Sequence, residues 1–238
     1  MYKYNIAKIS SIGSREINED SVYAKIDKEN IIAIVADGLG GHGGGDLASS
    51  LAIREIRKIL KKQKCITSLI MQDSISSANK AISELNGPKT TIAILSIEND
   101  LAIAAHAGDS RIYQFRDGKI IFQSQDHSVS QMAVAVGEIT IDQIRGHPDR
   151  NKILRALGSS EIIKSEINEL SVKNNDVFLL CSDGFWELIT EEEMEQNLLV
   201  SKFNVKKWLK IMNEYVIKRL NEKSDNYSAV CIIFNTVV

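Results

Sequence analysis

The sequence predicts an α+β fold in which antiparallel sheets are covered by pairs of helices. Short β-rich runs come first, two amphipathic helical segments follow, and a second series of strands precedes another helix pair and a last strand. Strands and helices therefore do not alternate singly, as they do in βαβ units. Hairpin-type turn signals between consecutive runs favour antiparallel pairing. We expect a layered α+β sandwich.

Length and composition fit one soluble domain. The 238 residues suit a single core, so we expect residues 1–238 to form one domain that acts as a monomer. The net charge of -2 shows no excess of basic residues of the kind that favours nucleic-acid binding. No apolar run nears the ~20 residues that span a bilayer, and the start, MYKYNIAKIS, lacks a secretory signal pattern. Three cysteines without tight spacing argue against a disulfide framework or a zinc site. We expect a cytoplasmic protein that binds neither nucleic acid nor membrane.

The first part of the chain predicts two strands, a glycine-rich loop and two helices. Residues 21–26 and 31–36 read as strands around a turn, and IIAIVA is apolar throughout, as in a strand buried on both faces. Residues 46–62 place apolar side chains at helical spacing with Arg and Lys on the other face, and we place Asp46 as the N-cap. A second helix is expected over 66–85, where Asn-Gly-Pro ends it.

The second part begins with four short strand-like runs, TTIAILSI, LAIAAHA, RIYQF and KIIFQ. The segments END, GDS and RDG separate them, so we expect a meander of four hairpin-connected strands. Residues 128–158 are mixed and contain short helical pieces. Strand character returns at 163–170 and 177–181, helices are expected at 190–199 and 205–220, and SAVCIIF forms a last strand.

Four aspartates lie at the ends of apolar runs. Asp37, Asp109 and Asp183 close strand-like runs, and Asp225 precedes one. Carboxylates crowd together only where a cation holds them, so the set indicates bound metal. Oxygen ligands without histidine or cysteine favour Mg²⁺ or Mn²⁺ over Zn²⁺ or Cu²⁺. Two ions about 3.5–4 Å apart could share a water and lower its pKa, which suits attack on phosphorus. Any one of these aspartates alone would more simply be a turn former.

Residues 38–45, GLGGHGGG, hold six of the chain's 14 glycines. They formally match the dinucleotide fingerprint G-x-G-x-x-G. That interpretation fails because Asp37 would repel a pyrophosphate, and because the next helix leads to another helix rather than to a parallel strand. There is no G-K-[ST], so the loop is not a P-loop. We interpret the glycines as allowing close backbone approach, with the Gly38 carbonyl facing a cation; a plain strand-to-helix turn is the alternative.

Four further polar residues are candidates for the same site. Arg15 could grip a phosphate bidentately, although an isolated arginine is more often a surface residue. Glu19 and Asp20 follow in the same segment and could accept hydrogen bonds from metal-bound waters. His42, inside the glycine loop, could protonate a leaving alkoxide or could simply be exposed to solvent. The sequence leaves both readings of His42 open.

Taken together, these segments resemble the metal-dependent Ser/Thr protein phosphatases of the 2C class, in their compact bacterial form. The ordered segments are IGSREINEDS, VADGLGGHGGGDLAS, KTTIAIL, AHAGDSRIY, QDHSVSQMAVAVGEIT, HPDRNKILRALG, LLCSDGFWELIT and SDNYSAVCIIF. The match runs nearly end to end, and the ordered series is very specific. The resemblance implies an αββα sandwich of two mainly antiparallel sheets flanked by helix pairs, with a small flap over about 128–158.

The resemblance also implies a ligand set for two core ions, Mn²⁺ or Mg²⁺, and an accessory third. Asp37 would bridge the two core ions, and Gly38 would give its carbonyl to one of them. Asp183 and Asp225 would bind the other. Asp109 matches the position that, with Asp183, holds the third ion in bacterial members.

The implied activity is one-step hydrolysis of phosphoserine and phosphothreonine in proteins. Arg15 would hold the substrate phosphate, and His42 matches a histidine with a proton-transfer or substrate role. The partners would be phosphorylated Ser/Thr proteins and a cognate Ser/Thr kinase whose signalling the enzyme reverses.

Two alternatives concern the use of such a fold. One is a binding module that only docks to a kinase or another partner, which the intact ligand set disfavours. The other is a narrow regulator of one phosphoprotein in a stress or sporulation switch; relatives of that kind commonly lack the opening arginine, so Arg15 disfavours it. Departures from the family pattern at 44–46, Pro88 and Tyr227 remove no proposed ligand.

Overall fold

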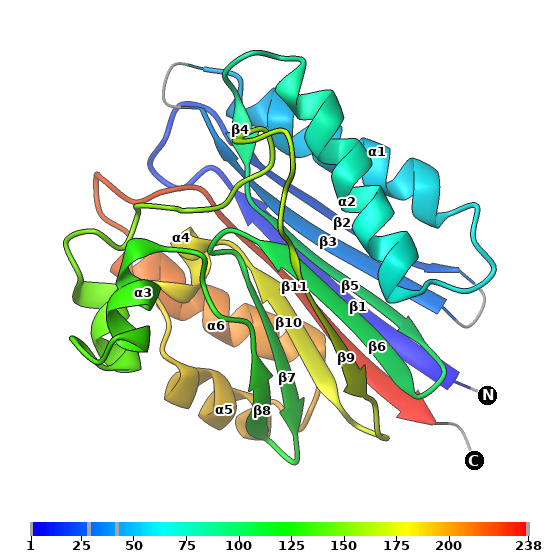
Figure 1. The fold of residues 1–238 in the computed structure, drawn as a ribbon. Helices are drawn as coiled ribbons and strands as arrows, with labels where there is room; N and C mark the ends of the chain where they lie inside the picture. Colours follow the sequence, from blue (N-terminus) through cyan, green and yellow to red (C-terminus); the bar gives the residue numbers. More distant parts are fainter. Residues whose placement is uncertain (1, 28–29, 41–42, 237–238) are drawn as a thin grey trace.

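The chain folds into four layers, in which two antiparallel sheets are stacked between two pairs of helices, as seen in a computed structural model (Figure 1). The structure describes residues 2–27, 30–40 and 43–236. The predicted α+β sandwich is confirmed. Within these residues, no helix is both long enough and apolar enough to cross a bilayer.

Each sheet mixes strands from the two ends of the chain. The first sheet contains, in spatial order, β1 (Tyr2–Ser11), β11 (Tyr227–Thr236), β10 (Val177–Cys181), β7 (Arg111–Arg116) and β8 (Lys119–Gln123). The second contains β2 (Asp20–Asp27), β3 (Asn30–Leu39), β5 (Ile92–Glu98), β6 (Leu101–Ala107) and β9 (Glu166–Ser171), with the short β4 (Lys89–Thr90) also paired to β3. All these pairs are antiparallel.

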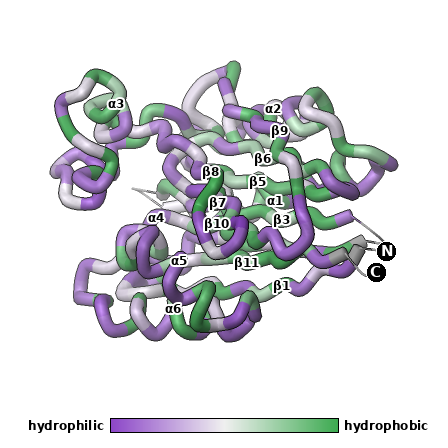
Figure 2. Tube along the Cα trace, turned by 90° about the horizontal axis from the view of Figure 1, so that it is seen from below, coloured by the Kyte–Doolittle hydropathy of each residue, from purple (hydrophilic) through white to green (hydrophobic). Residues whose placement is uncertain are grey.

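The helices cover the outer faces of the sheets. Helices α1 (Gly45–Leu60) and α2 (Ser68–Ser83) pack on the second sheet, and α5 (Glu191–Val200) and α6 (Val205–Arg219) pack on the first. Three short helices, α3 (Val129–Ala135), the 3₁₀ helix η1 (Ile141–Gly146) and α4 (Asp183–Trp186), complete the set. Figures 1 and 2 place α3 and α4 at the end of the sandwich opposite the start of β1 and the finish of β11.

Strand β3 shows how the layers are held together. Its alternate side chains Ile31, Ala33 and Val35 pack against the other sheet, whereas Ile34 and Ala36 pack under the helix pair. Both sets are fully buried because successive side chains of a strand point to opposite faces. The prediction that IIAIVA is a strand buried on both faces is confirmed, and the strand brings its carboxyl end to one edge of the sandwich.

Two local expectations are wrong. Asp46 is not the N-cap of α1: Gly44 occupies that position with φ 95°, and Asp46 lies in the first turn, where its charge still favours the helix dipole. The four central runs do not form one meander. β6 pairs with both β5 and β9, so neither of its edges is free for β7, and the segment 108–110 instead carries the chain from one sheet to the other.

Strand β1 is absent from the sequence prediction. It pairs with β11 at ten positions, from Tyr2↔Thr236 to Ser11↔Tyr227, and forms the edge of the first sheet. Of its described side chains, Tyr4 is buried while others are exposed, so its apolar pattern is weak. The pairing places the loop that follows β1 next to the segment that precedes β11.

We expect the Trp208→Ala variant to unfold far more easily than the Ile217→Ala variant of the same helix. Trp208 is fully buried, meets the Phe115 ring edge-on at 5.1 Å and donates from Nε1 to the Met194 carbonyl at 2.9 Å. Its truncation should cost about 3–5 kcal/mol of unfolding free energy. Ile217 is 53% exposed, so its truncation should change stability by about 0.5 kcal/mol or less. Urea denaturation measures both, and equal costs would contradict the packing of α6.

Candidate functional site

The four predicted aspartates come from both sheets. Asp37 lies near the end of β3 in the second sheet, and Asp183 begins α4 directly after β10 in the first. Asp225 lies just before β11, the neighbour of β10. Asp109 lies in the segment that passes between the sheets. Asp37 and Asp183 line the same cavity and each shifts the pKa of the other, so the sandwich brings distant parts of the chain to one centre.

Burial and like charge hold these carboxyl groups in an unfavourable setting. Burial, and then the charge of Asp183, raise the pKa of Asp37 well above its usual value. The pKa of Asp109 is raised in the same direction by burial and by Asp183. Burial and the neighbouring carboxylate of Glu187 raise the pKa of Asp183 from 3.8 to about 7. A cation at this centre would neutralise the charge that the protein leaves uncompensated.

Two buried oxygens support a divalent cation at this centre. Asp109 is 2% exposed, and its Oδ1 has no hydrogen-bond partner among the described residues. Asp20 is also buried; its Oδ2 accepts from the Ser182 hydroxyl at 2.7 Å, but its Oδ1 has no described partner. Unpaired buried carboxylate oxygens are costly unless a proton or a metal satisfies them, and hard oxygen donors suit Mg²⁺ and Mn²⁺. The residues present therefore fit such ions.

A cavity of about 490 Å³ opens over this centre. The predicted site residues among those that line it are Arg15, Glu19, Asp37, Gly38, Asp183 and Asp225. Asp109 and Asp20 are not in its lining and lie buried beside it, within electrostatic reach of Asp37. His42 lies outside the described residues, so its predicted role is not examined by the structure.

Arg15 lies at the mouth of the cavity. Its Nη2 donates to Asp225 Oδ2 at 2.8 Å, and the two side chains are 54% and 44% exposed. An exposed pair of this kind contributes little stability, so the guanidinium can leave the carboxylate at small cost. Arg15 is thus positioned to meet an anion that enters the cavity.

Asn226 fixes the loop that carries Arg15, and the sequence analysis did not identify it. Its amide donates to the carbonyls of Ile12 at 2.7 Å and Ile17 at 3.0 Å, and its Oδ1 accepts from the Glu19 backbone N–H at 2.8 Å. Asn226 is buried, so all three bonds are shielded from water. One side chain next to Asp225 therefore ties both sides of the Arg15 loop to the start of β11.

The glycines let β3 end against the start of α1. A Cβ on Gly38 would lie 2.2 Å from the Gly45 carbonyl oxygen, and one on Gly40 would lie 2.2 Å from Glu19 Oε1. The same Glu19 oxygen accepts from the Gly45 backbone N–H at 3.1 Å. Close backbone approach, as expected from the sequence, is what the structure shows at these positions. Glu19 therefore also stabilises the first turn of α1, a role that the sequence did not predict.

Two threonines hold the backbone of Asp37, and neither was predicted as a site residue. Asp37 N–H donates to Thr91 Oγ1 at 3.1 Å, while its carbonyl accepts from Thr91 N–H and Thr90 Oγ1, both at 2.8 Å. Thr91 Oγ1 is also 2.7 Å from Ser110 Oγ, beside Asp109. A polar pair at the start of the buried run TTIAILSI is the sequence signal for this contact.

The backbone of Asp109 is held from the other side by a buried tryptophan. Trp186 Nε1 donates to the Asp109 carbonyl at 2.9 Å. Arg111 lies 3.5 Å over the Trp186 ring and makes a bidentate pair with Asp126, with distances of 2.8 and 2.7 Å. The side chains of this ion pair are each 2% exposed. Arg111, which begins the strand-like run RIYQF, is the sequence signal that could have indicated this buried ion pair.

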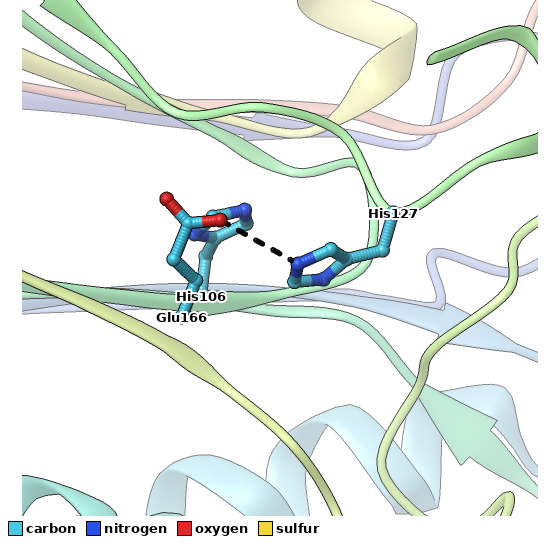
Figure 3. A group of neighbouring side chains, drawn as sticks. All are labelled: His106, His127 and Glu166. Atoms are coloured by element: carbon cyan, nitrogen blue, oxygen red, sulfur yellow. Dashed lines mark ion pairs between the residues drawn. The ribbon is translucent and has the colours of Figure 1, made fainter. Parts of the chain in front are cut away.

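A second group of potential metal ligands lies in the second sheet and in the loop after β8 (Figure 3). His106 of β6, Glu166 of β9 and His127 offer ligand atoms that all lie within 4.8 Å of one another. The two imidazole rings stack in parallel, with centroids 4.6 Å apart and an interplanar angle of 6°. Because nitrogen lone pairs lie in the ring plane, stacked rings cannot both point at one ion without turning.

Hydrogen bonds give the histidine pair a structural use. His106 Nε2 donates to the Gln125 carbonyl at 2.7 Å, and His127 Nδ1 accepts from the Gly108 backbone N–H at 3.2 Å. The backbone N–H of His127 in turn donates to the Gly108 carbonyl at 2.9 Å. Burial lowers the pKa of His127 to about 3, which keeps the ring neutral. Through these two bonds to Gly108, His127 stabilises the turn that leads to Asp109.

Comparison with known proteins gives consistent matches. A family model described as protein phosphatase 2C matches residues 9–226. The serine/threonine phosphatase stp of Listeria innocua is 33% identical over 198 residues, which are 77% of this chain and 78% of that protein. The crystal structure of the serine/threonine phosphatase PstP/Ppp of Mycobacterium tuberculosis superposes with a TM-score of 0.85 at 27% identity and covers 99% of both chains. A PstP catalytic domain in complex with two manganese ions has a TM-score of 0.85 at 26% identity, over 99% of this chain and 100% of that one.

We expect stabilisation by a divalent cation to increase with pH. A cation must displace the protons that the crowded carboxyl groups retain, and the pKa of Asp183 is about 7. The rise in Tm on adding Mn²⁺ should therefore grow as pH rises toward 7 and level off above it. Differential scanning fluorimetry at fixed Mn²⁺ measures the effect. Asp183→Asn should lose most of the rise, whereas Asp73→Asn, on the exposed face of α2, should keep it. A rise of equal size at every pH would contradict the carboxylate assignment.

Proposed function

Because the chain belongs to the protein phosphatase 2C family and is a protein Ser/Thr phosphatase, we propose that it hydrolyses phosphoserine and phosphothreonine at two divalent ions in the aspartate-lined cavity. The observation that carries the proposal is the meeting of carboxyl groups from both sheets in one cavity, beneath an exposed arginine. Mn²⁺ or Mg²⁺ fits the all-oxygen donor set, and the PstP domain that shares this fold is described with two manganese ions.

The proposed ligands have distinct positions. Asp37, from the second sheet, would be a ligand of both ions, and the Gly38 carbonyl would bind one of them. Asp183, which begins α4 after β10, and Asp225, which precedes the neighbouring β11, would bind the other. The effect of Asp37 and Asp183 on each other's pKa supports a shared centre. Asp109 would join Asp183 to hold an accessory third ion, a role supported by its buried Oδ1, which has no hydrogen-bond partner among the described residues.

The remaining polar residues around the centre would orient water. Asp20 presents a buried oxygen with no described partner, and Glu19 lines the cavity. Both are proposed to accept hydrogen bonds from waters in the ion coordination shell. Glu19 is restrained by its bond from the Gly45 N–H, so its carboxylate keeps a fixed direction while it does so.

The ions, when bound, supply charge neutralisation and an acidified water suited to attack on phosphorus. The chain's own residues supply positioning. Arg15 leaves Asp225 and takes the phosphate oxygens bidentately, which orients the phosphorus toward the floor of the cavity. Asn226 keeps the Arg15 loop in register with that floor. His42 is proposed to protonate the leaving serine or threonine oxygen.

The proposed partners follow from this chemistry. Residues 1–238 act as one phosphatase domain, as a monomer, on proteins phosphorylated by a cognate Ser/Thr kinase. The segment 128–158, which we call the flap, is closed at its base by a bridge between Ser128 and Ile153 and borders the cavity through Ile153 and Asn151. That placement supports a flap contact with the substrate chain.

Purified protein should release phosphate from a phosphothreonine peptide only with Mn²⁺ or Mg²⁺. Asp37→Asn should reduce release to background because it removes the bridging carboxylate. Asp73→Asn, on the exposed face of α2, is the matched control and should retain wild-type kcat. Release that persists in the presence of a chelator, or full activity of Asp37→Asn, would overturn the proposal.

Replacing Arg15 should weaken substrate binding rather than metal binding. Loss of a charge-assisted hydrogen bond of about 1.5–3 kcal/mol predicts a fall in kcat/KM of about 10- to 150-fold for Arg15→Ala, mainly through KM. Arg15→Lys should recover only part of this, since an ammonium group cannot bind bidentately. The Mn²⁺-induced rise in Tm should remain in both variants. An unchanged KM in Arg15→Ala would remove Arg15 from the phosphate site.

A further inference from the structure

We propose that a basic extension of the cavity selects substrates with an acidic side chain on one side of the phosphorylated residue. This inference rests on the proposed phosphatase site. A second cavity, of about 310 Å³, opens beside the first. The two share the lining residues Arg15, Asn151, Asp183 and Asp225. The shared lining places the two cavities side by side at the aspartate centre, and we treat them as one groove that would hold residues flanking a phosphorylated side chain.

Two cations line this extension beyond the shared residues. Arg150, from the flap, donates from Nε to Glu187 Oε1 at 2.7 Å and makes no other side-chain hydrogen bond with the described residues. Lys223, in the loop before β11, is exposed, and its Nζ has no hydrogen bond or ion pair within the described part of the chain. Arg150 balances Glu187, so Lys223 is the unbalanced charge of the extension.

The charge balance of the extension turns positive when the site is loaded. In the structure Arg15 is paired with Asp225, and Asp183 adds a second carboxyl group to the shared lining, with no ion pair among the described residues. Divalent ions on Asp183 and Asp225 would cancel these negative charges and free Arg15 for the substrate phosphate. Lys223 then faces the groove without a partner. An anionic side chain next to the phosphorylated residue is the chemistry that would recognise it.

The other side of the groove has the opposite character. Among the described residues, the lining of the first cavity beyond the centre includes Glu16 and Glu19, and its one cationic side chain is the shared Arg15. Lys89 lines a third cavity farther on, which also contains Asn151. A substrate chain across the centre therefore meets basic groups on one flank and carboxylates on the other. The groove distinguishes the two flanks of a substrate by charge.

The expected selectivity is modest. An exposed charge pair contributes about 0.2–1 kcal/mol, which corresponds to about a 1.4- to 5-fold change in kcat/KM. Salt screens exposed charges over about 8 Å at physiological ionic strength. The preference should therefore shrink as salt is raised, and it should appear in KM rather than in kcat because Lys223 does not contact the reacting atoms.

The test uses the full chain with Mn²⁺ and three phosphothreonine peptides of equal length. One is neutral on both flanks, one carries glutamates only before the phosphothreonine, and one carries them only after it. We expect one acidic peptide, and not the other, to exceed the neutral peptide by about 1.4- to 5-fold in kcat/KM. Lys223→Gln should remove this advantage and Lys223→Glu should reverse it. Lys89→Gln, which alters the third cavity, is the matched control and should leave it intact.

Hydrolysis of the neutral peptide tests the phosphatase proposal separately from the basic subsite. If wild-type protein with Mn²⁺ does not hydrolyse it, the phosphatase proposal fails. If wild type and Lys223→Gln hydrolyse it equally but no flank preference exists, the phosphatase proposal stands and the basic subsite is wrong. A preference that survives Lys223→Gln, or that disappears in Lys89→Gln, also overturns the subsite. Equal Mn²⁺-induced shifts in Tm confirm that each variant keeps an intact metal centre.

Discussion

Carboxylate crowding at one end of the sandwich is the constraint on which the rest of the structure depends. Asp37, Asp109 and Asp183 lie where burial and mutual repulsion raise their pKa values. For such groups the folded state retains protons that the unfolded chain loses, so their contribution to stability falls as pH rises from 3.8 toward about 7. A divalent cation removes this penalty. The site therefore couples folding stability to ion binding.

A centre of this kind needs a frame that cannot relax away from it. The two sheets supply carboxylates from opposite sides, β3 from one and the β10–β11 pair from the other. The apolar layer between the sheets fixes their separation. Local contacts then fix each backbone: Thr91 holds Asp37, Trp186 holds Asp109, and Asn226 holds the loop of Arg15. These backbone hydrogen bonds therefore hold the carboxylates in place.

The sequence predicts the parts of this design that are local. Strand-end aspartates and the strand buried on both faces depend on short patterns, and the structure places these aspartates at or near the ends of strands and buries β3 on both faces. The contacts that form only when distant segments pair were not predicted from the sequence. The crossing at 108–110 follows from β6 having both edges paired, which no local turn signal carries. Likewise, β1 has a weak apolar pattern and owes its strand form to pairing with β11.

The direct test of the central claim is the position of bound Mn²⁺ in crystals, located by anomalous diffraction. The account predicts two strong peaks flanking the Asp37 carboxylate, one also bound by Asp183 and Asp225. The group of His106, His127 and Glu166 is an internal competitor, because its ligand atoms all lie within 4.8 Å of one another. Manganese there, with no peak at Asp37, would contradict the account.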